Sequence, residues 1–369
     1  MNEKIKINWY RTKVDKAVMS DLMRKSDARA FAQVIPQLAL FVATGTLAFL
    51  AYRNINATNW TWAVPLLLLA LFVHGTFAFF FGGTATHELS HKTPFKTAYW
   101  NEFFLNVYAF LSWHDPVAYR VSHVKHHQVT VHHDHDGEVE LPQGLDWHGV
   151  KFVFWQLSPI IHPMAPINLV RKWIKIVRGD LSEGSWSFTP EWTAKILPEE
   201  NLKLRQEHRN WARTLLIGHL LLALLFVATG NWILILIVTF GCQYCSWLQL
   251  LCGAPQHAGM TPDVPDFRLC CRTFTCSWFP AFLYWNMQYH VEHHMFPAVP
   301  FYNLPRLRKA IEHDLPPAPH GLRATWKELV PILKRQRREP GYFFAPTLPS
   351  GEPIGTFVND DLLRAQAAQ

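Results

Sequence analysis

The chain has 369 residues, a formal net charge of +7, and a composition of 49% hydrophobic and 14% aromatic residues. Charged residues make up 17%, below the roughly one quarter that is usual in soluble domains, which argues against a soluble protein and indicates a membrane-embedded chain. The basic excess lies largely beside the apolar segments, where it suits anionic lipid headgroups, and we expect no nucleic-acid partner.

Hydropathy predicts four transmembrane helices, each close to the roughly 20 residues that cross a bilayer. These spans cover about 34–52, 61–81, 211–229 and 231–251. Short links inside each pair join them into two hairpins. Residues 1–29 carry eight lysines and arginines, whereas the link 53–60 carries Arg53 alone. The positive-inside rule therefore predicts that both termini lie on the cytoplasmic side.

Two weaker apolar stretches, 98–113 and 150–170, are expected to be interfacial or re-entrant, because the first is short and prolines interrupt the second. We expect residues 1–310 to form a single membrane-embedded domain and residues 311–369 to form a polar, proline-rich cytoplasmic tail. The predicted fold is an all-α integral membrane protein with interfacial helices and a histidine-rich cytoplasmic cap.

Three histidine motifs dominate the chemistry of the chain. They are HxxxH at 87–91, HxxHH at 123–127 and HxxHH at 290–294. Residues i, i+3 and i+4 share one face of a helix, so each motif can direct two or three imidazoles at one point. Two predicted spans separate the second motif from the third, which returns all three motifs to the cytoplasmic face.

Eight imidazoles favour a first-row transition metal such as iron or zinc over magnesium or calcium. Because one ion would rarely bind eight protein nitrogens, the count predicts two metal ions. A soluble di-iron bundle built on paired Glu-x-x-His motifs is rejected, since Glu88-x-x-His91 is the single copy. A metal transporter is the remaining alternative from another class, but transport needs ligands along a path across the bilayer and not at one face.

The order, spacing and position of the three motifs resemble the histidine boxes of the membrane fatty-acid desaturase family, whose superfamily also contains acyl and alkane hydroxylases. The run 285–297 is similar to the third box of bacterial acyl desaturases. Gln256-His257-Ala258-Gly259 resembles a stretch that supplies one further ligand in related proteins. The resemblance covers about 34–310. It implies two iron ions held by His87, His91, His123, His126, His127, His257, His290, His293 and His294.

The resemblance also implies the reaction. A di-iron centre reduced by two electrons uses O2 as co-substrate to oxidise an unactivated C–H bond. We expect a double bond to be introduced into a long-chain fatty acyl group; the alternative is hydroxylation of an acyl chain, an alkane or another membrane-soluble substrate. Animal acyl-CoA desaturases place an asparagine four residues before the extra histidine, where this chain has Gly253, so the metal shell is expected to differ from that branch.

Two carboxylates lie inside the boxes. Glu88 and Glu292 are expected to orient imidazoles by accepting hydrogen bonds from them; the alternative is a solvated or salt-bridged glutamate. A second acidic and histidine-rich run, 132–136, follows the second box. We interpret it as supporting or surface groups at the face that meets an electron donor, with a third metal site as the alternative. His74 and His219 lie inside predicted spans and are expected to be neutral side chains bonded to another helix.

The sequence contains neither the His-Pro-Gly-Gly signature of cytochrome b5 nor the cysteine spacing of an iron–sulfur cluster. We therefore expect a separate electron donor of the ferredoxin or cytochrome b5 type, together with its reductase. The basic residues in 334–338 could attract an acidic carrier, or they could face lipid headgroups.

Overall fold

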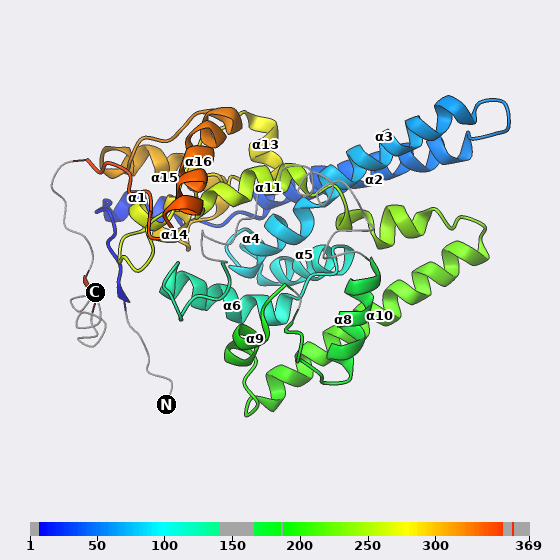
Figure 1. Ribbon diagram of the computed structural model, residues 1–369, viewed down its shortest axis with the longest axis horizontal. Coiled ribbons are helices and arrows are strands. Elements are labelled where there is room, and N and C mark those ends of the chain that lie inside the picture. The colour runs from blue at the N-terminus through cyan, green and yellow to red at the C-terminus, as the bar shows by residue number, and fades with distance from the viewer. Residues whose placement is uncertain (1–6, 140–165, 186, 350–355, 358–369) are drawn as a thin grey trace.

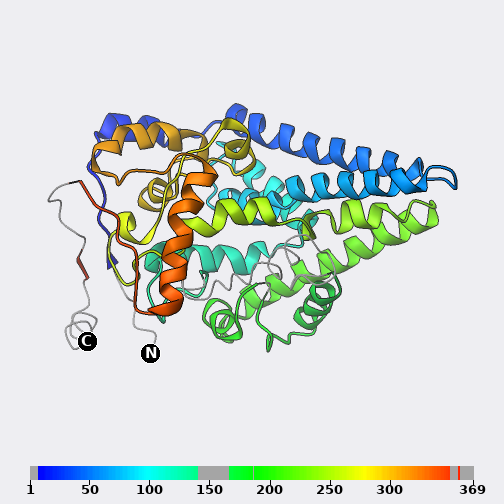
Figure 2. The same cartoon turned by 45° about the horizontal axis from the view of Figure 1, so that its top comes forward.

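The computed structural model describes residues 7–139, 166–185, 187–349 and 356–357, and its regular structure is almost entirely helical. Two long hairpins extend to one side, and shorter helices from both ends of the chain pack together at the other side (Figure 1). The turned view in Figure 2 shows the same division. The first and last described segments pair as a short antiparallel ribbon, so they lie side by side.

The elements of the hairpins and their extensions are α2 (Asp27–Arg53), α3 (Trp60–Ala78), the π-helix η1 (Phe81–Ala85), α4 (Thr86–Ser90), α10 (Leu202–Ala228), the π-helix η3 (Ile235–Thr239), the 3₁₀ helix η4 (Gly241–Gln243) and α11 (Trp247–Gly253). Along the chain, the two hairpins are separated by α5 (Ala98–Leu111), α6 (Pro116–Val129), α8 (Pro166–Val177) and α9 (Pro190–Ile196). The remaining elements, which we call the cap, are β1 (Ile7–Asn8), α1 (Lys16–Leu22), η5 (Ala254–Gln256), α12 (Phe267–Cys270), α13 (Trp278–Leu283), α14 (His290–Met295), η6 (Phe301–Asn303), α15 (Leu304–Ile311), η7 (Glu312–Asp314), α16 (Gly321–Arg338) and β2 (Thr356–Phe357).

The first hairpin contains the first two predicted spans. Helix α2 begins where the Ser26 side chain accepts a hydrogen bond from the backbone N–H of Arg29, which satisfies one of the unpaired donors of the first turn. Asp27 in that turn and Arg53 in the last turn complement the helix dipole. Leucine, valine and tryptophan side chains on α2 and α3 remain exposed, as expected for surfaces that face lipid and not water.

Helix α3 continues through η1 into α4 without a break in the helical path. The run Trp60–Ser90 is 31 residues long and apolar enough to cross a membrane. The π-helix η1 lies directly before the first histidine box, a position at which such wider turns often accompany functional sites. The hairpin therefore delivers His87 and His91 at its inner end.

The second hairpin differs from the sequence prediction in its returning arm. Helix α10 contains the predicted third span, and it is long and apolar enough to cross a membrane. The predicted fourth span, 231–251, is not one helix, because it is divided into η3, η4 and α11, and Cys245 between them has a left-handed φ of 61°. Three helices in the described part of the chain meet the length and composition of a span. The count of four therefore stays a prediction.

The interruption is stabilised by side chains from neighbouring helices. The carbonyl of Ile237 accepts from His74 Nε2 at 2.9 Å, and the carbonyl of Thr239 accepts from Trp113 Nε1 at 2.7 Å. Non-helical backbone at membrane depth is tolerated where protein groups satisfy it. His74 also contacts Thr44 Oγ1 at 2.9 Å, so this histidine of a predicted span is bonded to neighbouring helices, as expected from the sequence.

The two predicted interfacial stretches have different outcomes. The first is the helix α5, which contacts α4 and α6 and ends at Leu111. Most of the second stretch, 150–170, lies outside the described residues, and its last residues open α8. Helix α8 packs its buried Leu169, Trp173 and Ile176 against α10.

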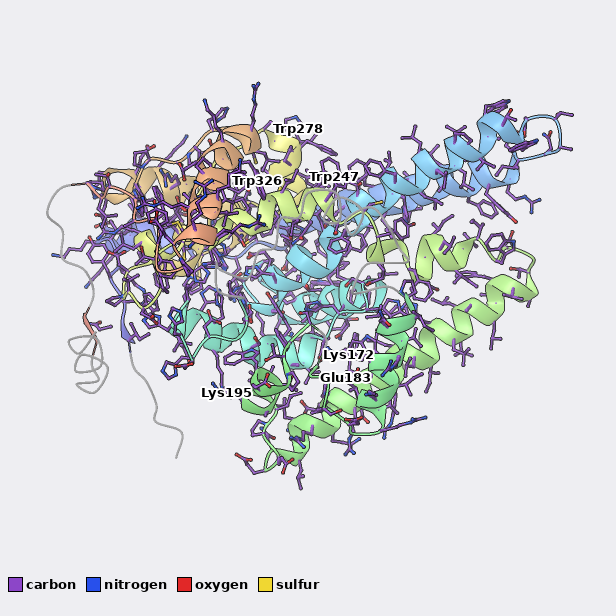
Figure 3. The ribbon with its side chains drawn as sticks, in the orientation of Figure 1. Lys172, Glu183, Lys195, Trp247, Trp278 and Trp326 are labelled. Atoms are coloured by element: carbon purple, nitrogen blue, oxygen red, sulfur yellow. The ribbon has the colours of Figure 1, made fainter. Side chains whose placement is uncertain are left out.

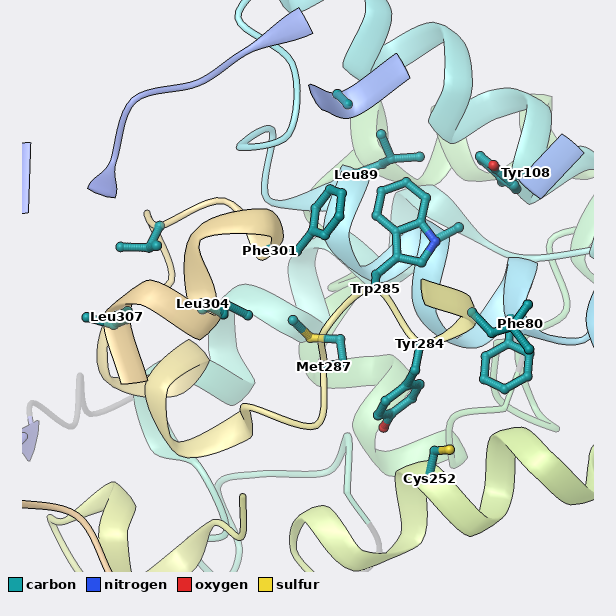
Figure 4. Packing of buried hydrophobic residues seen from close by; sticks show 14 of the residues in the cluster. Phe80, Leu89, Tyr108, Cys252, Tyr284, Trp285, Met287, Phe301, Leu304 and Leu307 are labelled. Carbon is teal, nitrogen blue, oxygen red and sulfur yellow. The ribbon is translucent and has the colours of Figure 1, made fainter. Parts of the chain in front are cut away.

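A buried cluster of aromatic and aliphatic side chains joins the first hairpin to the cap (Figure 4). At its centre Trp285 is fully buried and donates from Nε1 to Gln37 of α2 at 2.9 Å, and the hydroxyl of Tyr108 lies 3.1 Å from the same amide oxygen. Trp285 and Asn286 both adopt left-handed φ values, 48° and 56°. This conformation is unfavourable for bulky residues and must be held by the surrounding packing.

Helix α16 belongs to the segment predicted to be a polar tail. It buries Leu329 and Leu333 against Ala258, next to His257. The Trp326 indole, labelled in Figure 3, donates to the carbonyl of Leu251 at 2.9 Å. The C-terminal segment thus braces the loop that carries a predicted metal ligand.

We expect Leu329→Ala to destabilise the protein by about 2–5 kcal/mol, because Leu329 is fully buried and its truncation leaves a cavity beside the loop of His257. Thermal unfolding in detergent measures the effect. Leu221→Ala, at an exposed position of α10, is the matched control and should leave the melting temperature nearly unchanged. Equal shifts for both variants would contradict a bracing role for α16.

Candidate metal centre

The nine predicted ligands converge in two groups at the inner ends of the hairpins. The first group comprises His87, His91, His123, His127 and His293. The second group comprises His126, His257, His290 and His294. In each group every residue offers one ligand atom, and these atoms lie within 4.8 Å of one another. Each group could therefore hold one metal ion.

Helices α6 and α14 divide their histidines between the two groups. His123 and His127 are one turn apart on α6 and join the first group, whereas His126 faces the second. On α14, His290 and His294 join the second group and His293 faces the first. Positions four residues apart share a face, and the intervening residue points about 100° away. Each HxxHH motif therefore bridges the two groups.

The distances between imidazole nitrogens match shared coordination. The Nε2 atoms of His91 and His127 lie 2.9 and 3.1 Å from Nε2 of His123. In the second group, the Nε2 atoms of His257 and His294 lie 2.8 and 3.0 Å from that of His290. Two nitrogens bound at right angles to an ion roughly 2.0–2.1 Å away would be about 3 Å apart.

The tautomers in the second group require a cation. Nδ1 of His257 must donate to the carbonyl of Cys270 at 3.0 Å, which leaves a lone pair on Nε2. Thr130 donates its hydroxyl to the His126 carbonyl and so accepts from Nδ1 of His294, which again leaves a lone pair on Nε2. Both lone pairs point at His290. One proton on His290 cannot satisfy both, but a metal ion between the three nitrogens can.

Burial supports the same conclusion. It lowers the pKa of His257 to about 3, so the imidazole stays neutral and keeps the lone pair that a metal needs. His293 is buried, and neither of its ring nitrogens has a hydrogen-bond partner among the described residues. Buried polar atoms without partners are rare in proteins, and a metal ion in the first group would supply one for His293.

Carboxylates behind the rings fix their orientation. Asp136 accepts from Nδ1 of His126 at 2.7 Å, and Glu138 lies 2.5 Å from Nδ1 of His123. Burial disfavours charge on Asp136, but His126 outweighs it and holds the pKa of this carboxyl below its ordinary value. Burial raises the pKa of Glu138 to about 7. Acceptors of this kind hold metal-binding histidines in one tautomer.

The two glutamates inside the boxes have different surroundings. Glu88 Oε1 lies 3.0 Å from Nδ1 of His87. Glu292, in contrast, accepts from Thr273 at 2.5 Å and from Arg308 at 3.0 Å, and no imidazole donates to it among the described residues. Its expected contact with an imidazole is therefore not made, because its side chain leaves α14 on the face opposite the histidines and ties that helix to α15.

Sequence reasoning missed Glu138, the Thr130 hydroxyl and the Cys270 carbonyl. A carbonyl has no sequence signal. Glu138 could have been included among the predicted supporting groups, because it lies two residues after Asp136, the last residue of the acidic run noted in the sequence. Within that run, His133 pairs with Asp263 and not with either group. His219 donates from Nε2 to the Phe110 carbonyl, 2.9 Å away, as expected for a histidine bonded to another helix.

A cavity of about 250 Å³ lies against both groups of histidines. Its wall includes His87 and His123 from the first group and His126, His257 and His290 from the second. Phe188, Tyr284, Met287, Gln249 and Gln256 complete much of the rest. A molecule in this cavity would therefore lie beside histidines of both groups.

We expect the purified protein to carry two metal ions per chain, one in each group. His290→Ala removes a ligand of the second group and should lower the content toward one ion, measured by elemental analysis. His133→Ala changes a partly exposed histidine outside both groups and should retain both ions. Full metal content in the His290→Ala protein would count against the assignment.

Asp136→Asn removes charge without changing shape. The His126 ring then loses an ionised acceptor, and we expect metal affinity at the second group to fall by about 10–100-fold, as measured by competition with a chelator. Asp134→Asn changes an exposed neighbour and should have no such effect. If the two variants behave alike, Asp136 does not support the metal centre.

Comparison with known proteins agrees with this geometry. The family model described as "Fatty acid desaturase" matches residues 60–326, nearly three quarters of the chain and all three histidine boxes. No curated protein matches the chain significantly. The matched region contains the extension of the first hairpin, the second hairpin and all nine histidines of the two groups. The chain therefore belongs to the fatty acid desaturase family.

Proposed function

We propose that the chain is a membrane-bound di-iron enzyme that uses O2 to introduce a double bond into a long-chain fatty acyl group carried as a lipid or thioester. The observation that carries the proposal is the pair of histidine groups, five and four imidazoles, on the wall of one cavity. Five and four ligands leave open positions on ions that accept six, as catalytic metal sites require.

The residues of the chain have distinct tasks in this proposal. The nine histidines would hold two iron ions, which supply the two-electron activation of O2 and the oxidising power for an unactivated C–H bond. Asp136, Glu138 and the Cys270 carbonyl hold three of the rings in place. Phe188, Tyr284 and Met287 form apolar parts of the cavity wall, which position a chain and keep water from the reacting carbon.

The apolar surfaces support the proposed placement in a membrane. The exposed leucines of α2, α3 and α10 suit lipid contact. The basic residues of 1–29 support a cytoplasmic position for the cap and therefore for the metal centre. A long-chain acyl substrate dissolved in the same leaflet would reach the cavity without crossing water.

The electrons are proposed to come from a separate carrier of the ferredoxin or cytochrome b5 type. The exposed basic residues of α16 provide one surface for an acidic partner. One of them, Arg335, is already bonded to Glu339 at 2.8 Å and lies over the Tyr342 ring. Lys334 and Arg338 are the more accessible charges for docking.

Product analysis tests the reaction. The purified protein, loaded with iron and supplied with a ferredoxin and its reductase, should convert a saturated C16 or C18 acyl chain to a product lighter by two hydrogens. A product heavier by one oxygen identifies the hydroxylase alternative. Metal-free protein is the control and should give neither. Intact acyl chains despite full iron loading and electron supply would contradict both desaturation and hydroxylation of an acyl chain.

A further inference from the structure

The side-chain amide of Gln249 lies against the helix that carries the first histidine box. A Cβ atom added at Gly83 would be 2.4 Å from Gln249 Nε2, so the absence of a side chain at Gly83 gives the amide its place. Gly83 is four residues before His87 in the same helical run. The amide of Gln249 is therefore in the cavity wall, close to the first group of histidines.

The hydroxyl of Tyr284 approaches the same space from the cap. A Cβ atom added at Gly253 would lie 3.4 Å from the Tyr284 hydroxyl and 3.5 Å from Gln249 Nε2. Figure 4 shows the Tyr284 hydroxyl directed toward α11, which carries Cys252 and Gly253. The Gln249 amide and the Tyr284 hydroxyl thus both approach the position that a side chain at residue 253 would occupy.

The polar atoms of Gln249 and Tyr284 form no hydrogen bond that stabilises the described fold. Within the described part of the chain, the Gln249 amide and the Tyr284 hydroxyl make no hydrogen bond to protein, although Tyr284 is only 3% exposed. The other glutamine of the wall, Gln256, donates to the carbonyl of Met287 at 3.1 Å. Tyr284 is buried, Gln249 is partly buried, and both residues line the cavity, so a molecule in the cavity is the natural hydrogen-bond partner of this pair.

The chemistry of the pair defines that partner. An amide and a phenol each donate and accept one or more hydrogen bonds, which suits a hydroxyl or a carbonyl oxygen. A saturated hydrocarbon segment offers neither. Glu138 also lines the cavity, but its oxygens are already bonded to His123 and Ser122. Among the described wall residues there is no lysine or arginine, so a carboxylate or phosphate would lack a side-chain cation there.

We infer that Gln249 and Tyr284 are specificity-determining residues that select a substrate chain bearing a neutral oxygen function, a hydroxyl or a carbonyl, close to the carbon that is oxidised. The inference rests on the proposed function, because it assigns a substrate class to the same cavity. It places the oxygen within hydrogen-bonding reach of the wall that also presents His87 and His257.

Equilibrium binding to the iron-loaded protein, under anaerobic conditions and without an electron donor, tests the inference. The probes are hexadecane, hexadecan-1-ol, and the mid-chain hexadecanols and hexadecanones, presented in the same lipid nanodiscs. We expect at least one oxygenated probe to bind about tenfold more tightly than hexadecane, the effect of one or two buried hydrogen bonds. A preference for hexadecan-1-ol identifies a head-end oxygen, and a preference for a mid-chain isomer identifies a substituted chain.

Two variants assign the effect to the pair. Gln249→Leu and Tyr284→Phe should each reduce the preference for the oxygenated probe by about fivefold while the affinity for hexadecane stays constant. Tyr99→Phe, at an exposed tyrosine, is the matched control. Tyr284→Phe removes a single oxygen atom and tests the inference even if Gln249→Leu fails to fold.

Two outcomes would overturn the inference. One is hexadecane binding as tightly as every oxygenated probe, and the other is an equal loss of affinity for all probes in both variants, which would mean that the pair only shapes the cavity. The measurement needs no turnover. Selective binding by a protein that oxidises no acyl chain would therefore refute the proposed function and leave the binding preference standing.

Discussion

The arrangement of this protein depends on nine imidazoles whose ring nitrogens converge on two buried positions. Without cations these nitrogens would repel one another at about 3 Å in a medium of low polarity. Bound cations would turn this repulsion into attraction, because binding energy at a metal site is also folding energy. The groups join α4, α6 and α14 to the loop of His257, segments far apart in the sequence. Two metal ions bound there would therefore also fasten the hairpins to the cap.

The rest of the fold restricts the freedom of these rings. Asp136 and Glu138 lie in the turn after α6 and fix two of its histidines. The loop of His257 is held from one side by the Cys270 carbonyl and from the other by α16. Two consecutive left-handed residues, Trp285 and Asn286, set the entry to α14; Trp285 donates to Gln37 on α2, and Asn286 donates to the carbonyl of Phe301. Each support comes from a different part of the chain, so the site cannot form locally.

Gly253 illustrates how one position connects the site to its substrate. The sequence comparison expected a difference in the metal shell there. In the structure a Cβ atom at Gly253 would lie 3.4 Å from the Tyr284 hydroxyl and 3.5 Å from Gln249 Nε2, and these two residues belong to the cavity wall shared by the two groups of histidines. A small residue at this point lies next to the polar pair and changes no predicted ligand. Under the proposed function its consequence is for substrate recognition.

The sequence by itself determined the apolar segments of the hairpins and eight of the nine histidines, because apolar length and the i, i+3, i+4 spacing are local properties of a helix; the ninth, His257, was implied by the family resemblance. It could not divide the nine into five and four, since neighbours such as His126 and His127 separate only when α6 meets both α4 and α14. It also predicted one helix over 231–251, where His74 and Trp113 instead satisfy an interrupted backbone. Such contacts join residues more than 100 positions apart, and only the tertiary structure could decide them.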